Sequence, residues 1–137
     1  MSDRSLRATA VSLALAGAAI MAYLLVERHR GGAPVCVGGG CAAVQHSKYA
    51  EIFGLPVALL GLGGFLAVAL SSVASGERAR VVQATLVLSA LGFSAYLLVV
   101  ELLVIHAVCQ WCVAGDVALS GLAVVVLLRS QRVRESA

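Results

Sequence analysis

Charged side chains are scarce in this sequence, in which Asp, Glu, Lys and Arg make up only 12% of the 137 residues. Soluble domains carry about 25% charged and about 45–50% apolar residues. Here 61% of the residues are hydrophobic, and the mean hydropathy is +0.98. These values exclude a water-soluble globular protein and indicate a protein in contact with membrane lipid.

The chain also lacks a basic run interleaved with aromatic residues, although its net charge is +3. Nucleic-acid-binding domains usually show such a basic patch, so no nucleic-acid partner is expected. The length leaves no room for a membrane core together with a fused soluble domain of about 100 residues. We therefore expect a single membrane domain over residues 1–137, with any soluble catalytic partner on a separate chain.

Four apolar stretches are long enough to cross a bilayer, because about 20 apolar residues span a hydrocarbon core of ~30 Å. The expected helices cover about 8–26, 55–75, 81–105 and 109–128, and the last is the weakest because it contains Asp116. The predicted fold is an all-α integral membrane four-helix bundle. A loop of about 27–52 joins its first two helices, and so long a loop is usually functional or disordered.

Lysine and arginine are unevenly divided between the two ends of this bundle. One end carries Arg28, Arg30 and Lys48, and the other carries seven arginines, namely Arg4, Arg7, Arg78, Arg80, Arg129, Arg132 and Arg134. Cytoplasmic segments are enriched in these residues. We expect a multi-pass protein with both termini in the cytoplasm and the 27–52 loop outside.

The four cysteines form two close pairs, Cys36 with Cys41 and Cys109 with Cys112. The predicted topology places both pairs at the outer end, where disulfides persist in an oxidising compartment. Three alternatives remain open from spacing alone: a redox relay, two static disulfides, or a zinc site. The zinc reading is the weakest, because zinc pairs usually have similar short spacings.

Cys109 is the expected exchange partner within the second pair. A Cys-x-x-Cys motif at a helix start places its first thiol near unpaired backbone N–H groups, which favour the thiolate. Cys112 lies one turn deeper, where a membrane-soluble oxidant can reach it. The three glycines between Cys36 and Cys41 allow the loop to close on itself or to move Cys41 toward Cys109.

Three segments together resemble a bacterial member of the vitamin K epoxide reductase family. They are Cys36-Val-Gly-Gly-Gly-Cys41, the stretch from Ser47 through Pro56 to Gly61, and the stretch from Tyr96 and Glu101 to Cys109-Gln-Trp-Cys112. The resemblance implies a four-helix bundle in the bacterial inner membrane that holds a quinone, either ubiquinone or menaquinone, near the outer surface. It also implies a counterpart of disulfide bond formation protein B, which reoxidises a periplasmic thioredoxin-fold oxidase and passes two electrons to quinone.

The same resemblance implies roles for the cysteines. Cys36 and Cys41 resemble the loop relay pair, with Cys41 passing electrons to Cys109 and with Cys112 next to the quinone. Ser47 matches a loop hydroxyl that regulates the loop or bonds the quinone region. The chain has no fused thioredoxin-like domain, so the partner is implied in trans. Asp116 stands where vertebrate members have tyrosine, so a true vitamin K epoxide reductase remains an alternative, as does a non-enzymatic membrane subunit stapled by zinc or disulfides.

Further candidate residues have a structural interpretation, and most of them also have a functional one. Asp116 either relays a proton to the quinone or is merely solvated or hydrogen-bonded, since a charge at depth is costly. Glu101 either reaches the headgroups or orients the helix end. His106 either stabilises the Cys109 thiolate or is an interfacial residue. Trp111, with Tyr23, fits an aromatic belt. Phe53, with Leu55, Leu59 and Phe65, either lines a quinone pocket or faces lipid, and no metal ligand set is expected.

Overall fold

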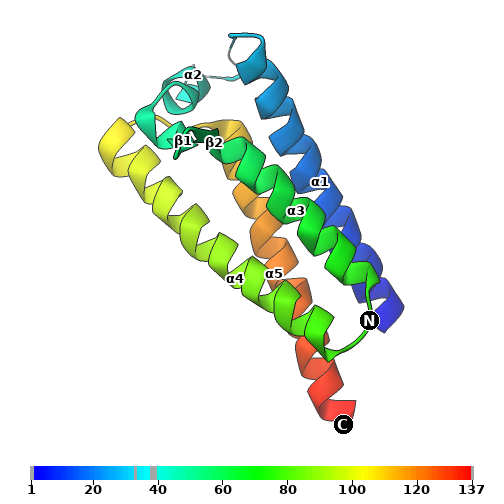
Figure 1. Cartoon of the computed structure of the whole chain (residues 1–137). Coiled ribbons are helices and arrows are strands. Elements are labelled where there is room, and N and C mark those ends of the chain that lie inside the picture. Colours follow the sequence, from blue (N-terminus) through cyan, green and yellow to red (C-terminus); the bar gives the residue numbers. More distant parts are fainter. Residues whose placement is uncertain (1, 33, 38–39, 137) are drawn as a thin grey trace.

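The computed structural model describes residues 2–32, 34–37 and 40–136 and consists mainly of helices (Figure 1). Four long helices dominate this part of the chain, and they are α1 (Asp3–His29), α3 (Val57–Val73), α4 (Glu77–Val100) and α5 (Gln110–Ser136). The shorter elements are α2 (Gly40–Gln45), the 3-10 turn η1 (Lys48–Ala50), the strands β1 (Glu51–Ile52) and β2 (Leu55–Pro56), and the π-helical η2 (Glu101–Ile105).

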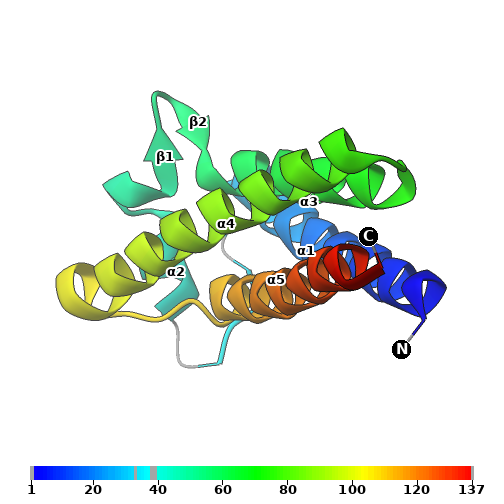
Figure 2. The ribbon, with the colours of Figure 1, turned by 90° about the horizontal axis from the view of Figure 1, so that it is seen from below.

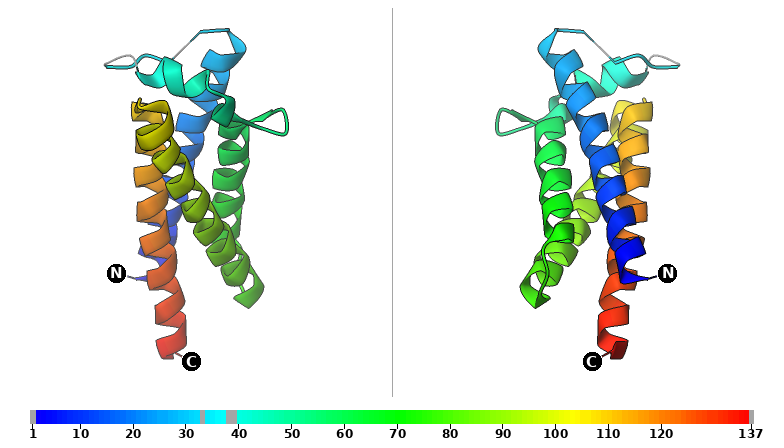
Figure 3. Two further views of the ribbon diagram at one scale, coloured as in Figure 1. Left: turned by 90° about the vertical axis from the view of Figure 1, so that its left-hand side faces the viewer. Right: turned by 90° about the vertical axis from the view of Figure 1, so that its right-hand side faces the viewer.

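The long helices alternate in direction, so both termini lie at one end and the segment with α2, β1 and β2 lies at the other (Figures 1 and 3). Helix α1 packs against α3 and α5, and α4 packs against the same two helices. Helix α1, α4 continued by η2, and α5 are long and apolar enough to cross a membrane. Helix α3 has 17 residues, or about 26 Å at 1.5 Å per residue, which is close to the thickness of the hydrocarbon core.

Helices α1, α4 and α5 begin or end beyond the apolar stretches, and at the start of α1 a side chain caps the helix. Helix α1 begins at Asp3, where the side chain of Ser2 accepts a hydrogen bond from the Ser5 N–H at 3.2 Å. Helix α3 begins directly after Pro56, as the missing proline N–H favours. Helix α5 continues to Ser136, well past the expected end at residue 128.

The segment from 27 to 52 is more structured than a plain loop. Within its described residues it holds α2, η1 and β1, while the expected loop glycines Gly38 and Gly39 lie outside the described residues. Strand β1 pairs with β2 in an antiparallel hairpin, which Figure 2 shows projecting away from the helices. The described chain is mostly helical, as predicted, and this short hairpin is a feature that the prediction did not include. Its two-residue turn, Phe53 and Gly54, has positive φ at both positions (53° and 79°), as a type I′ turn requires.

The bundle core depends on small residues along α1. Ala10, Ala14 and Ala18 are buried there, and they let α3 and α5 approach closely. At Gly17 a side-chain carbon would lie 2.4 Å from the Phe65 ring, so this position has no room for any larger residue. Many large apolar side chains on the outer faces stay exposed, as expected for helices that contact lipid.

Candidate functional site

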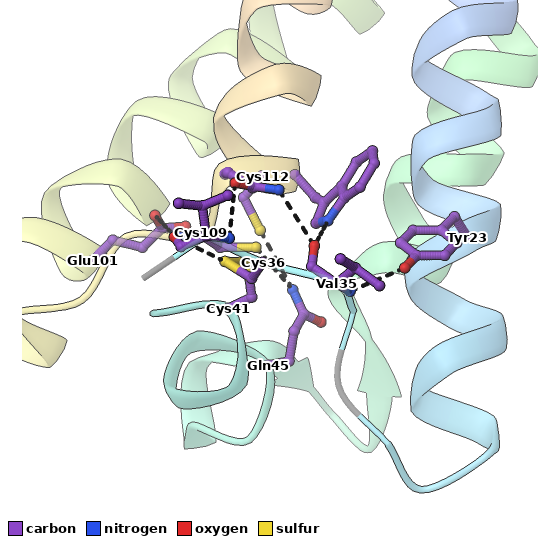
Figure 4. Close-up of a disulfide and its surroundings, with 11 residues drawn as sticks. Tyr23, Val35, Cys36, Cys41, Gln45, Glu101, Cys109 and Cys112 are labelled. Carbon is purple, nitrogen blue, oxygen red and sulfur yellow. Dashed lines mark hydrogen bonds between the residues drawn. A yellow bond between two sulfur atoms is a disulfide. The ribbon is translucent and has the colours of Figure 1, made fainter. Parts of the chain in front are cut away.

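The four cysteines lie together at the end of the bundle opposite the termini (Figure 4). Cys36 and Cys41 are joined by a disulfide, whereas Cys109 and Cys112 are free thiols. Cys41 and Cys109 are completely buried and share one cluster with Val44, against which Cys36 and Cys112 pack. Helix α2 supplies Cys41, and the start of α5 supplies Cys109 and Cys112. The structure thus brings an oxidised pair and a reduced pair into contact.

Cys109 is held in a setting that favours its thiolate. The hydrogen bond from the Cys112 thiol is the largest influence, and it lowers the pKa of Cys109 from 9.0 to about 6 against the opposing effect of burial. Backbone N–H groups of Cys112 and Trp111 and the Gln45 amide lower the pKa further. The backbone donors belong to the first turn of α5, as expected for a thiol at a helix N-terminus. Cys109 is therefore mostly ionised at neutral pH.

Gln45 contacts both free thiols and is a site residue that the sequence analysis missed. Its side-chain Nε2 donates to Cys112 Sγ at 3.4 Å and to Cys109 Sγ at 3.7 Å, and Figure 4 shows its amide directed from α2 toward the two sulfurs. The spacing held a signal, because Gln45 lies four residues after Cys41 and so shares its helix face. One side chain on α2 thus links the helix of the first pair to the thiols of the second.

Two contacts of Arg28 fix the position of α2. Its Nη1 donates to the Gln45 backbone oxygen at 2.8 Å, and its Nη2 forms an ion pair with Glu51. These contacts tie the end of α1 to α2 and β1. From the sequence alone, Arg28 is recognisable only as a positive charge.

A second set of contacts holds the segment before Cys36. The Val35 N–H donates to the Tyr23 hydroxyl at 3.0 Å, and the Val35 oxygen accepts from Trp111 Nε1 at 2.6 Å and from Gln110 Nε2 at 3.3 Å. The Tyr23 and Trp111 rings lie 4.9 Å apart. An aromatic belt is therefore an incomplete account of these two residues, because both position the chain that carries Cys36.

Glu101 is buried, with 4% of its surface exposed. Its carboxylate accepts a hydrogen bond from the Cys109 N–H at 3.3 Å, which agrees with the interpretation that it orients the helix end and not with the alternative that it reaches the headgroups. The π-helical turn that begins at Glu101 interrupts the α-helical repeat and accompanies this inward placement. Glu101 thereby orients the segment that leads into the Cys109 motif.

His106 ends the π-helical turn in a left-handed conformation, with φ of 57°. Its side chain is exposed. The donors that most favour the Cys109 thiolate are Cys112, Gln45 and two backbone N–H groups rather than the imidazole. The structure therefore gives His106 a role in ending the helix and provides no support for a role as the cation beside Cys109.

A cavity of about 90 Å³ lies next to α2, between those ends of the four long helices that are opposite the termini. Cys112, Glu101 and Asp116 line it together with Ser47 and Arg28. The remaining wall is largely apolar and includes Met21, Leu24, Leu97, Val100 and Ile105. The cavity therefore places a free thiol, two carboxyl groups and a hydroxyl around one apolar space.

Two predicted residues of this wall are also held by hydrogen bonds. Asp116 accepts a hydrogen bond from the Ser94 hydroxyl. The Ser47 hydroxyl donates to the Val44 backbone oxygen at 2.8 Å, which links it to α2. Asp116 is thus hydrogen-bonded, as one of its two interpretations expected, and it lines the cavity, while its role in proton relay stays a prediction.

Two interpretations were open for Phe53, Leu55, Leu59 and Phe65, a place in a quinone pocket or contact with lipid, and none of the four lines this cavity. Phe53 and Leu55 are exposed on the hairpin and Leu59 is exposed on α3. Phe65 packs into the bundle core. No local sequence pattern predicted that the hairpin turn carries Phe53 outward.

The described residues contain no group of three or more His, Cys, Asp or Glu side chains that could hold a metal ion. Two of the four sulfurs are bonded to each other. A site with four thiolate ligands is therefore not the arrangement that this structure shows.

The comparison with known protein families agrees with the arrangement of helices and cysteines. The model of the family described as the vitamin K epoxide reductase family matches residues 8–127, which include both cysteine pairs and most of the four long helices. This match covers far more than half of the chain. The protein is a membrane oxidoreductase that belongs to the vitamin K epoxide reductase family.

Proposed function

We propose that this protein is a thiol-quinone oxidoreductase that reoxidises a separate thioredoxin-fold disulfide oxidase and passes two electrons to quinone. The observation that carries the proposal is the single buried cluster in which the Cys36–Cys41 disulfide meets the Cys109 and Cys112 thiols. The cavity beside Cys112 supports the quinone end of the route.

The first step is exchange between the partner dithiol and the loop disulfide. Cys36 is half-buried whereas Cys41 is fully buried, so the partner thiolate attacks Cys36 Sγ and Cys41 leaves as a thiolate. The second thiolate of the partner then attacks the partner sulfur that is bonded to Cys36, and Cys36 leaves as a thiolate. The partner becomes a disulfide, and the loop pair gains two electrons as two thiols.

The second step moves these electrons to the pair on α5, which must then be a disulfide. The Cys41 thiolate attacks Cys109 Sγ and Cys112 leaves, after which the Cys36 thiolate attacks Cys41 and Cys109 leaves. The low pKa of Cys109, about 6, makes it a good leaving group. This exchange restores the loop disulfide and the helix dithiol, which is the state seen in the structure.

The third step oxidises the helix dithiol. Cys109 and Cys112 form a disulfide, and two electrons with two protons pass to quinone, which leaves as quinol. Cys112 faces the cavity, and the apolar wall suits a quinone ring. Asp116 and Ser47 are placed to bind the ring oxygens or to deliver protons.

The proposed setting is the bacterial inner membrane, with both termini in the cytoplasm and the cysteines at the periplasmic surface. The excess of arginine at the end with the termini supports this orientation. The partner then meets the loop disulfide in an oxidising compartment.

Trapping the intermediate between the two pairs tests the relay. A Cys36→Ser variant cannot release Cys41 from Cys109, so it should accumulate a Cys41–Cys109 disulfide that peptide mass spectrometry detects. A Cys36→Ser/Cys109→Ser variant is the matched control and should not form this bond. Free thiols alone in Cys36→Ser protein oxidised by quinone would contradict the relay.

Quinone reduction by the purified protein tests the complete reaction. With a reduced thioredoxin-fold oxidase as donor, the wild type should convert ubiquinone or menaquinone to quinol, and each single Cys→Ser variant should abolish steady turnover. Comparing the two quinones under the same conditions identifies the preferred acceptor. Turnover with either pair removed would refute a route through both pairs.

A further inference from the structure

A second cavity, of about 60 Å³, lies at the end of the bundle that carries the termini. The start of α1, the turn between α3 and α4, and the end of α5 surround it. Three guanidinium groups line it, those of Arg7, Arg80 and Arg129, and Asp3 is the one carboxylate in its lining. The described wall of this cavity therefore carries an excess of positive charge.

Arg129 is almost completely buried, with 7% of its side chain exposed. Its Nη1 donates to Gln83 at 3.4 Å, but its Nε is buried and finds no hydrogen-bond acceptor among the described residues. Asp3 forms an ion pair with this Nε, but at 3.7 Å its oxygen is too far away for a hydrogen bond. Leaving a buried charged donor without a hydrogen bond is costly. The Nε of Arg129 therefore needs an acceptor that the described residues do not supply.

Arg7, on α1, shows the same pattern. Its Nε is also buried without an acceptor in the described part of the chain, and its Nη2 lies 3.7 Å from Asp3. Asp3 is itself mostly exposed, at 60% of its side chain. Arg80 makes no ion pair with any residue that the structure describes. One exposed carboxylate thus faces three arginines, two of which have a buried and unpaired N–H.

The backbone adds further positive potential to this cavity. Helix α4 has 24 residues and begins after Gly76, where no side chain caps its first N–H groups. Ala74, Ser75 and Gly76 all line the cavity. The start of a helix binds anions through its free N–H groups and its dipole, so the backbone and the guanidinium groups favour the same kind of ligand.

We propose that this cavity binds a phosphate group, most readily the phosphodiester of an anionic phospholipid headgroup. A phosphate oxygen can accept the unpaired Nε–H bonds of Arg7 and Arg129, and guanidinium groups match phosphate geometry. The cavity lies at the ends of membrane-spanning helices, where headgroups are found. The expected cytoplasmic leaflet is rich in anionic lipid. This inference does not depend on the thiol-quinone proposal.

Thermal unfolding of the delipidated full-length protein in detergent tests the site. We expect dioctanoyl-phosphatidylglycerol to raise the unfolding midpoint more than dioctanoyl-phosphatidylcholine, because ligand binding to the folded state stabilises it. Inorganic phosphate, titrated in parallel, separates the two sources of the group. A shift with the lipid alone identifies the headgroup, and a shift with both identifies a phosphate site that is open to small anions.

Arg7→Gln and Arg80→Gln are the test variants, and each should weaken binding of the phosphatidylglycerol probe about tenfold, as expected for the loss of a charged hydrogen bond. Arg132→Gln is the control, because it removes the same charge from an exposed position on the same helix as Arg129, and it should change affinity less than about twofold. Arg129→Lys serves as a third test that keeps the buried charge. The proposal is overturned if no probe shifts the midpoint, or if Arg132→Gln weakens binding as much as Arg80→Gln.

Discussion

The hydrogen bond from Cys112 to Cys109 determines how readily Cys109 ionises. Cys112→Ala removes this bond, so the pKa of Cys109 should rise from about 6 toward its ordinary value of 9.0. Cys112→Ser keeps a hydroxyl donor and should raise the pKa less. The measurement is the ultraviolet absorbance of the thiolate as a function of pH, made with the Cys36–Cys41 disulfide intact.

The sign of the pH dependence follows from the direction of this shift. In the wild type the thiolate should be lost as the pH falls through about 6, and exchange at Cys109 should slow there. In Cys112→Ala the same loss should occur at higher pH. Equal titration curves for the wild type and Cys112→Ala would show that Cys112 does not stabilise the thiolate.

The Gln45 amide makes a smaller contribution to the same thiolate. Gln45→Leu keeps an apolar side chain of similar size but removes the donor at 3.4 and 3.7 Å from the two sulfurs. A hydrogen bond to a charged group contributes about 1.5–3 kcal/mol, so the pKa of Cys109 should rise by about one to two units. His46→Ala, at the exposed neighbouring position, should leave it unchanged. A rise of equal size in both variants would contradict a specific role for Gln45.

At the scale of elements, the contact between α2 and the segment before α5 keeps the two cysteine pairs together. Gly40 begins α2, and a side-chain carbon there would lie 2.4 Å from the Val108 backbone oxygen and 3.0 Å from its nitrogen. Backbone atoms cannot move aside as a flexible side chain can. Gly40→Ala should therefore push α2 away from the residues around Cys109.

This displacement has a measurable effect on the relay. In the Cys36→Ser background, Gly40→Ala should lower the yield of the Cys41–Cys109 disulfide several-fold. Gly64→Ala is the matched control, since nothing lies within 4 Å of its added carbon and alanine favours a helix over glycine by about 1 kcal/mol. An unchanged disulfide yield in Gly40→Ala protein would show that close packing of α2 is not needed for exchange.

The membrane-spanning elements were predictable from the sequence because hydropathy and length are local properties. The run before Glu27 and the run after Pro56 both became helices of the bundle. The helix ends were less predictable, since capping by Ser2 carries α1 outward into charged residues. The hairpin was missed because its Phe53-Gly54 turn lacks the usual Asn-Gly or Asp-Gly signal.

The candidate site, too, was predictable from the sequence only in part. Both cysteine pairs lie next to the ends of expected spans, and an even number of spans separates them. The sequence therefore predicted that the two pairs meet at the same end of the bundle. The inward carboxylate of Glu101 depends on a π-helical turn, and the bonds to Val35 join residues more than 70 positions apart in sequence. Such contacts are set by tertiary packing, so a single sequence holds little information about them.

For the whole molecule, the distribution of charge predicts how the bundle lies in the membrane. The end with the termini carries seven arginines, whereas the end with the cysteines carries Arg28, Arg30 and Lys48, and Arg28 is paired with Glu51. Basic residues are retained on the cytoplasmic side during insertion. We therefore expect the termini inside and both cysteine pairs outside.

Single cysteines in a background with all four native cysteines changed to serine test this orientation. Ser2→Cys marks the end with the termini, and Gly32→Cys marks an exposed position at the end with the native cysteines. A maleimide that cannot cross membranes should label Gly32→Cys on intact spheroplasts and Ser2→Cys only after permeabilisation. The reverse pattern would place the sulfur pairs in the reducing cytoplasm, where the disulfide with a periplasmic partner could not form. Labelling of both positions from outside would contradict the antiparallel arrangement of the helices across the bilayer, because that arrangement separates these two ends.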